Sequence, residues 1–192
     1  LLPDVDFGPG IRELITELSI AGNRPVNWNA VAVTGRPNAE ESTGRQLAVS
    51  NYARERGGEV IALIMPGTPD MFFNLKTGCV FDANPGIWRE VFKWPVEKRI
   101  EKFRDPALRK QMADDLMAVP TDSQLSYVAR IENFFVNSVT AEKNKKYEGQ
   151  LVSDIAKAEG REPIDIMLDI ALDDDLTTIF RPTLVGHDHA SF

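Results

Sequence analysis

The sequence predicts an α/β fold, and the first observation behind this prediction is a strand, a helix and a second strand in succession. Residues 24–33 (RPVNWNAVAV) and residues 59–65 (EVIALIM) are rich in β-branched and small apolar side chains, which is typical of strands. Residues 38–58 between them have the character of a helix. This order implies a parallel pair with a right-handed crossover, and a parallel pair needs cover on both faces.

The ends of this helix carry their own signals. Asn38 is a candidate N-cap, and Glu41 follows it at the capping-box spacing, which satisfies two N–H groups. Gly57 and Gly58 favour the left-handed conformation in which many helices end. We therefore expect a helix that begins after Asn38 and stops at these glycines.

The second observation is another helix directly before the first strand. Pro9 suits the first helical position, and Gly22–Asn23 forms the predicted stop. Apolar residues at helical spacing form its predicted buried face: Ile11, Leu14, Ile15 and Leu18. The resulting alternation of helix, strand, helix and strand is typical of barrels and doubly wound sheets.

The third observation is the composition. The 192 residues are 43% apolar, which is enough for the core of one ordinary domain or of part of a larger one. A net charge of −7 argues against a nucleic-acid partner, and no apolar run is long enough to span a membrane. The single cysteine, Cys79, excludes an internal disulfide framework and favours a cytoplasmic location.

The pattern changes after Met65. Residues 66–88 combine turn-forming proline and glycine with large apolar side chains, which predicts a long ordered loop of the kind that covers or binds a ligand. A helical stretch follows, with Val96, Ile100 and Phe103 on one stripe. Asp105–Pro106 predicts a new helix start, and that helix continues to Pro120. Its predicted buried stripe is Leu108, Met112 and Leu116.

The last third of the chain mixes element types. Residues 126–139 look extended, and residues 141–149 read as a polar loop. Residues 151–160 predict a short helix closed by Gly160, and a second helix starts at Glu162–Pro163. After that helix, the segment DDDLTTIFRPTLV is predicted to begin with a turn and to continue as a strand.

Two clusters suggest metal ions, but neither has a full ligand set. His187 and His189 alternate along the chain and could share one zinc ion, yet a zinc site needs a third protein ligand and solvent exposure is the simpler interpretation. Asp173, Asp174 and Asp175 lack the EF-hand spacing for calcium, so we expect the helix to end near Leu172 and the aspartates to cap the next turn. Cys79 has no histidine partner nearby, which favours a buried structural role.

Four residues are candidate substrate contacts. Asn27 and Asn29 lie two apart on a predicted strand and therefore point the same way; their amides could bond to one another, to water or to a ligand at the strand end. Tyr147 precedes Glu148–Gly149 and could touch substrate, although Glu148 could equally sit at a helix N-terminus. Lys76, like Arg181, could anchor a carboxylate, with surface solvation as the alternative.

General catalytic motifs do not appear in the sequence. It contains no nucleophile elbow, Walker loop, dinucleotide-binding glycine motif, HExxH or CxxC. The residues taken alone therefore predict an α/β scaffold with a lid, and they assign no catalytic or metal-binding residue.

The order of several segments resembles the central part of the amidohydrolase family that contains the D-aminoacylases, or N-acyl-D-amino-acid deacylases. The likeness extends from about Ile11 to the end, and the most specific segments are RIEKFRDPALRKQM and YEGQLVSDIAKAEGREPIDIMLDIALDDDL. The other two are GNRPVNWNAVAV and GGEVIALIMPGTPDMFFNLKTGCVFDANPGIW. The resemblance implies a metal-dependent hydrolase on a (β/α)₈ barrel with a largely helical inserted lid.

The resemblance also implies which parts are present. Residues 1–65 would be barrel βα units, residues 66–147 the inserted lid and residues 148–192 a return to the barrel. In the family, zinc polarises an amide carbonyl and activates water, and a late aspartate serves as general base. The early HxH pair and that aspartate would lie before Leu1 and after Phe192. The His187–His189 pair follows the YEG segment and so is not the early pair.

We therefore expect a piece of a longer enzyme, beginning at Leu1 without methionine, that hydrolyses N-acyl-D-amino acids or similar C–N bonds. This piece would shape the substrate pocket, and the zinc ligands would lie outside it. On the strand where the family often has a ligand histidine, this chain has Asn29 or Ala30. The alternative is a stand-alone, non-catalytic α/β binding or regulatory module. An incomplete barrel would expose sheet edges, so we also expect self-association.

Overall fold

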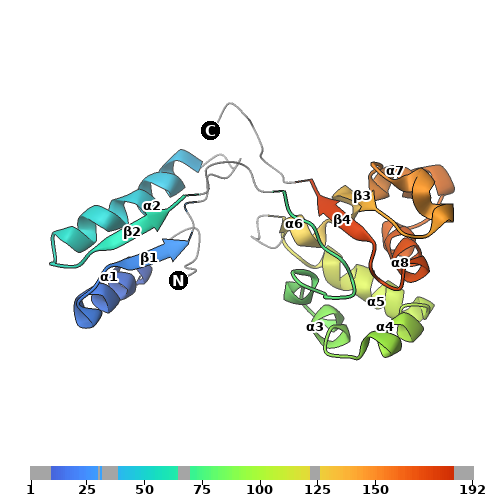
Figure 1. Ribbon diagram of the computed structural model, residues 1–192, viewed down its shortest axis with the longest axis horizontal. Helices are drawn as coiled ribbons and strands as arrows, with labels where there is room; N and C mark the ends of the chain where they lie inside the picture. Colours follow the sequence, from blue (N-terminus) through green and yellow to red (C-terminus); the bar gives the residue numbers. More distant parts are fainter. Residues whose placement is uncertain (1–9, 30, 32–38, 65–69, 122–125, 184–192) are drawn as a thin grey trace. The chain divides into compact units, whose positions relative to one another are not determined.

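The computed structural model describes residues 10–29, 31, 39–64, 70–121 and 126–183. The chain divides into two compact units (Figure 1). Unit 1 contains the described residues up to Ile64, and unit 2 contains those from Asp70 to Thr183. The fold is mixed α/β, mostly helical, with one two-stranded sheet in each unit, and the described residues do not form a barrel.

Unit 1 alternates helix and strand as the sequence predicts. Its two strands pair in parallel, with Val26 opposite Val60 and Asn29 opposite Leu63. The elements are α1 (Ile11–Gly22), β1 (Val26–Asn29), α2 (Ala39–Arg54) and β2 (Val60–Leu63). The parallel pair predicted for this stretch is therefore confirmed.

The helices cover one face of this sheet. Trp28 and Val60 are buried there and pack in a cluster with Ile15, Val49 and Ala53. Side chains alternate along strands, so the other face carries Asn27, Asn29, Ile61 and Leu63, which are all exposed. The two asparagines do point the same way.

The buried face of α1 differs from the prediction. Ile15 is buried, but Leu14 and Leu18 are 49% and 46% exposed. Thr16 and Ser19 are buried instead. The Ser19 hydroxyl accepts from the Glu59 N–H at 2.8 Å and donates to the Arg24 carbonyl, so it ties the end of α1 to the starts of both strands. The buried face of α1 therefore includes the polar Ser19, and Leu14 and Leu18 lie outside it.

The helix ends of unit 1 follow the glycine signals. α1 ends at Gly22, and Asn23 adopts φ 46°, a left-handed C-cap. After α2, Gly57 has φ 82° and the Gly58 N–H donates to the Ala53 carbonyl at 2.9 Å. The predicted N-cap at Asn38 lies outside the described residues.

Unit 2 packs short helices around an antiparallel strand pair. β3 (Phe134–Ser138) pairs with β4 (Ile179–Pro182), and Phe180 also forms a bridge with Phe73 at the start of the unit. The α-helices are α3 (Ile87–Val91), α4 (Val96–Lys102), α5 (Pro106–Met117), α6 (Ser126–Ala129), α7 (Val152–Glu159) and α8 (Pro163–Asp173). Three 3₁₀ helices complete it: η1 (Phe81–Ala83), η2 (Ile131–Asn133) and η3 (Glu142–Tyr147).

Aromatic side chains from distant segments form the centre of this core. Phe81 stacks against Trp88 at 6.0 Å between ring centroids and meets Phe134 at 5.7 Å. The buried Trp88 indole donates to the Met112 carbonyl at 2.8 Å, which satisfies its one polar group. α3, α5 and β3 are thus held against one another.

Several predicted helices of unit 2 are confirmed. The Asp105 carboxylate accepts from the Ala107 N–H at 2.9 Å, and Pro106 is the first residue of α5. The three stripe residues of α5 are buried: Leu108, Met112 and Leu116. α7 ends at Gly160 with φ 65°, and α8 begins at Pro163, both as predicted.

Other expectations for unit 2 are wrong. Of the stretch 126–139, only residues 134–138 form a strand, because Val128, Ala129 and Ile131 bury their side chains from a helical turn instead. The stretch 66–88, by contrast, was expected to be an ordered loop with short pieces of structure, and its described part does contain η1 and the start of α3. The expected polar loop 141–149 contains η3.

Gly86 allows α3 to begin against α5. It has φ 67°, and the Ile87 N–H donates to the Asp115 carboxylate at 2.7 Å. A Cβ at Gly86 would lie 2.2 Å from Asp115 Oδ2. Gly160 has a similar φ of 65°, but no atom lies within 4 Å of its Cβ position.

We predict that Gly86→Ala lowers the unfolding free energy by about 3 kcal/mol, because backbone strain adds to the collision with Asp115. Gly160→Ala, which meets strain alone, is expected to cost about 1 kcal/mol. Urea unfolding followed by circular dichroism measures both. Equal losses would contradict the role given to Asp115.

Candidate functional site

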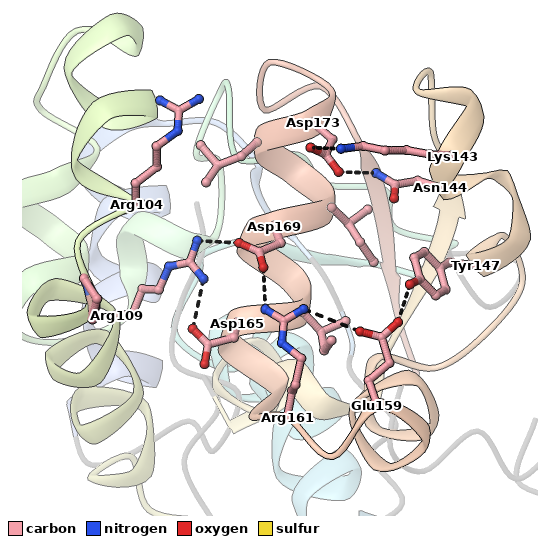
Figure 2. A pocket seen from close by; sticks show the side chains of 14 residues that line it. Arg104, Arg109, Lys143, Asn144, Tyr147, Glu159, Arg161, Asp165, Asp169 and Asp173 are labelled. Carbon is pink, nitrogen blue, oxygen red and sulfur yellow. Dashed lines mark hydrogen bonds and ion pairs between the residues drawn. The ribbon is translucent and has the colours of Figure 1, made fainter.

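A pocket of about 750 Å³ opens in unit 2, along one side of α8 (Figure 2). That volume is in the usual range for small-molecule sites. α8 forms its floor with the buried Ile166 and Ile170, and α5 and η3 form its walls. Eight charged residues line it: Arg104, Arg109, Lys143, Glu159, Arg161, Asp165, Asp169 and Asp173.

A continuous network of hydrogen bonds and ion pairs crosses the pocket (Figure 2). It starts at Tyr147, whose hydroxyl donates to Glu159, and Glu159 pairs with Arg161 at 3.5 Å. Arg161 then pairs with Asp169. Because these residues come from η3, α7 and α8, the network holds three elements at fixed positions around the pocket.

Arg109 extends the network to α5. Its guanidinium donates to Asp165 at 3.0 Å, to Asp169 at 2.6 Å and, through Nε, to the Phe103 carbonyl at 2.6 Å. The side chain is only 12% exposed. All three nitrogens donate to protein groups, so Arg109 positions α5 on α8.

The network shifts the pKa of Asp169. Burial alone would raise this pKa, but hydrogen bonds from Arg109 and Arg161 outweigh burial and bring the pKa below its usual value of 3.8. Asp169 is therefore a stably ionised partner of two arginines, which is the opposite of what a general acid needs.

Tyr147 is the predicted substrate contact that lies in this pocket. Glu148, next to it, accepts from the Val139 N–H at 2.9 Å and from Lys145 at 2.8 Å. Hydrogen bonds from both groups lower the Glu148 pKa, with the Lys145 bond as the larger cause. Glu148 thus stabilises the turn after β3. Within residues 147–149, Tyr147 is the residue that lines the pocket.

Lys76 and the two asparagines lie elsewhere. Lys76 is exposed in unit 2 but is not a lining residue, and its main-chain carbonyl accepts from the buried Arg99 at 2.8 Å. Asn27 and Asn29 belong to the exposed sheet face of unit 1. Arg181 lies over the Phe135 ring at 4.7 Å. Asn27 and Asn29 therefore share one face of β1, and Lys76 does not line the pocket with Tyr147.

A metal centre does not fit the described part of the chain. It contains no group of three or more His, Cys, Asp or Glu that could hold an ion. Asp174, expected to cap a turn, accepts from the Thr140 N–H at 2.9 Å and the Ala141 N–H at 2.6 Å. Cys79 is exposed, contrary to the expected burial. His187 and His189 lie outside the described residues.

Comparisons of the chain with protein-family models, with curated proteins and with solved structures find no match. Among the described helices, none is both long and apolar enough to cross a membrane. The family expectation therefore rests on the segments quoted from the sequence.

Sequence reasoning missed most of the pocket. Arg109, Arg161 and Asp169 are ordinary surface-type residues, and Arg109 lies far from Asp169 along the chain. One usable signal existed: Asp165 and Asp169 are four apart on a predicted helix, so they share a face. Two carboxylates on one helix face repel each other unless a cation lies between them, but the sequence does not show which lysine or arginine that cation is.

We predict that Arg109→Ala lowers the unfolding free energy by about 2 kcal/mol, because it leaves Asp165 and Asp169 close together and partly buried without their cation. Lys110→Ala is the matched control: Lys110 pairs with Asp114 at the surface, and its loss is expected to cost less than about 0.5 kcal/mol. Urea unfolding measures both variants, and similar costs would show that the pocket network adds no stability.

The lowered pKa of Asp169 gives a pH prediction. Its folded pKa lies below the unfolded value of 3.8, so its stabilising contribution is complete well above that pH and is lost as the pH falls through 3.8 toward the folded pKa. Asp169→Asn is expected to be less stable at neutral pH but to lose less stability on acidification. Unfolding free energies at several pH values test this, and parallel curves would exclude it.

Proposed function

We propose that this chain is part of a metal-dependent amidohydrolase similar to the D-aminoacylases, and that it shapes the pocket for an N-acyl-D-amino acid or a compound with a similar C–N bond. In this proposal the zinc ligands and the general base come from residues of the parent protein outside this chain. The chain's own contribution is to bind and orient the substrate.

The observation that carries the proposal is the uncovered face of the parallel β1–β2 pair. Parallel strands occur almost only in sheets that are covered on both faces, as in (β/α)₈ barrels. In unit 1 the described helices cover one face, while the other exposes Ile61 and Leu63 beside Asn27 and Asn29. An apolar face with two amides suits the interior of a larger barrel, where Asn29, at the carboxyl end of its strand, would face the substrate.

Unit 2 supports the proposal in a second way. Its residues 70–147 stand where the resemblance implies the inserted lid, and residues 148–183, which the resemblance assigns to the barrel, belong to the same unit. The pocket of this unit includes Tyr147. Every pocket carboxylate is paired with a cation: Asp165 and Asp169 with Arg109, Glu159 with Arg161, and Asp173 with Lys143. These pairings suit recognition and leave proton transfer to other residues.

The same pairings support a second candidate function, a non-catalytic α/β binding module. A general base must be free to accept a proton from water or substrate. No lining carboxylate of this pocket is free in that sense. If the parent protein has no hydrolase activity, ligand binding in this pocket would be the function of the chain.

We predict that the 192-residue chain by itself releases no leucine from N-acetyl-D-leucine, with or without added zinc, because it supplies binding groups only. The protein encoded by the whole reading frame is expected to release leucine and to stop when a chelator removes its metal. Amino-acid release by chromatography measures both.

Chelator-sensitive hydrolysis by the 192-residue chain would show that the metal site had been placed wrongly. An inactive whole protein, tested with zinc and with several N-acyl-D-amino acids, would replace the enzyme proposal with the binding module. Self-association, which the unpaired strand edges of an incomplete barrel would favour, stays a separate prediction of this proposal.

A further inference from the structure

We propose that unit 2 is one self-contained domain, inserted into the surrounding fold between paired entry and exit segments, and that it opens and unfolds as a single piece. The division that the resemblance implies is different, because there residues 148–183 return to the barrel. That the surrounding fold is a barrel rests on the proposed function. The unity of residues 70–183 rests on their own contacts.

The chain enters and leaves unit 2 at adjacent points. Near the start of the unit, the Phe73 N–H donates to the Phe180 carbonyl at 2.9 Å, and the Phe180 N–H donates back to the Phe73 carbonyl at 2.8 Å. Phe180 belongs to β4, the last strand of the unit, which runs antiparallel to the segment around Phe73 (Figure 1). A domain whose two ends lie side by side can be inserted into a single loop of a host fold.

α8 is enclosed within unit 2, although the resemblance assigns it to the barrel. Met167 and Leu168 are consecutive and therefore point in different directions from the helix, yet both are fully buried. Of the eleven residues of α8, only Asp173 is exposed. A helix on the outside of a barrel would bury one face and leave the opposite face in water. The buried side chains of α8 pack instead in the core of unit 2.

Both parts of unit 2 contribute to this one core. Met112 of α5 and Met167 of α8 are fully buried members of the same apolar cluster, and Phe180 of β4 belongs to it as well. The rings of Phe73 and Phe134 lie 6.5 Å apart between centroids in the same cluster. A boundary after residue 147 would therefore divide a continuous hydrophobic core and expose apolar surface on both sides.

Polar contacts join the same two parts. Arg109 of α5 donates to Asp169 of α8 at 2.6 Å. Asp174, which follows α8, accepts from a backbone N–H of the segment before η3 at 2.9 Å. The Thr183 N–H donates to the Asn133 carbonyl at 2.9 Å. Separating the two parts would leave these groups without their partners, which adds to the cost of opening one part alone.

The simpler interpretation is a lid of residues 70–147 that packs on a separately stable piece of barrel. In that case, loosening α5 would open the lid and leave α8 and β4 protected. A single domain behaves differently, because loosening α5 opens α8 and β4 to the same extent. Amide hydrogen exchange therefore separates the two interpretations.

The experiment follows amide hydrogen exchange of the 192-residue chain by mass spectrometry, with Met112→Ala as the test variant. Loss of this buried side chain is expected to speed exchange of the slowest amides in α5, α8 and β4 alike, by at least about thirtyfold. Exchange in α1 and α2 is expected to stay within about twofold of the unmodified chain. Val49→Ala is the matched control: Val49 lies in the separate core of unit 1, so its loss should speed exchange in α1 and α2 only.

A second measurement needs no variant and so does not depend on the folding of Met112→Ala. Exchange of the unmodified chain is followed at rising urea concentrations below the unfolding transition. The slowest amides of α5, α8 and β4 are expected to converge on one opening free energy with one urea dependence, which is the behaviour of a cooperative unit.

The proposal is overturned if α8 and β4 keep their protection while α5 loses it, or if they exchange together with unit 1. Common opening of residues 70–183, together with an inactive whole protein, would sustain the inserted domain and reject the enzyme proposal. Hydrolysis by the whole protein, together with separate opening of α5 and α8, would do the reverse.

Discussion

The contact that organises the pocket of unit 2 is the guanidinium of Arg109 between Asp165 and Asp169. Two carboxylates one turn apart on α8 repel each other, and a largely buried arginine from α5 turns that repulsion into a link between helices. Arg161 and Glu159 extend the link to α7, and Tyr147 extends it to η3. Polar groups of these elements line the rim of the pocket. The buried Ile166 and Ile170 of α8 form its floor.

This arrangement explains why the pocket looks charged yet offers little catalytic chemistry. Hydrogen bonds from Arg109 and Arg161 outweigh burial and hold Asp169 in its ionised state, as its lowered pKa shows. A site of this kind selects a ligand by charge and shape. Reactive groups, where a reaction takes place, must be supplied by other residues, which is the division of labour proposed here between binding and catalysis.

The sequence could predict elements whose signals are local. The cap at Asp105 and the stop at Gly160 each depend on a few neighbouring residues, and the parallel pairing of β1 with β2 follows from the order strand, helix, strand. All three are found. Long-range contacts were not predictable. The Glu59 N–H donates to Ser19, and Arg109 donates to Asp169. Neither hydrogen bond has a signal in the neighbouring sequence. Of the candidate contacts, Tyr147 lies in the pocket and Lys76 does not.

The bridge between Phe73 and Phe180 joins the first and last segments of unit 2, with N–H groups donating in both directions at 2.9 and 2.8 Å. Phe180 also pairs with Val136 in the β3–β4 ladder, so the final strand completes two sets of contacts at once. During synthesis, the ribosome must therefore release nearly the whole of this unit before its hydrophobic centre can close. Until then, Phe73 and Phe134 lack the strand that covers them, so this unit closes late and through contacts that are far apart in the sequence.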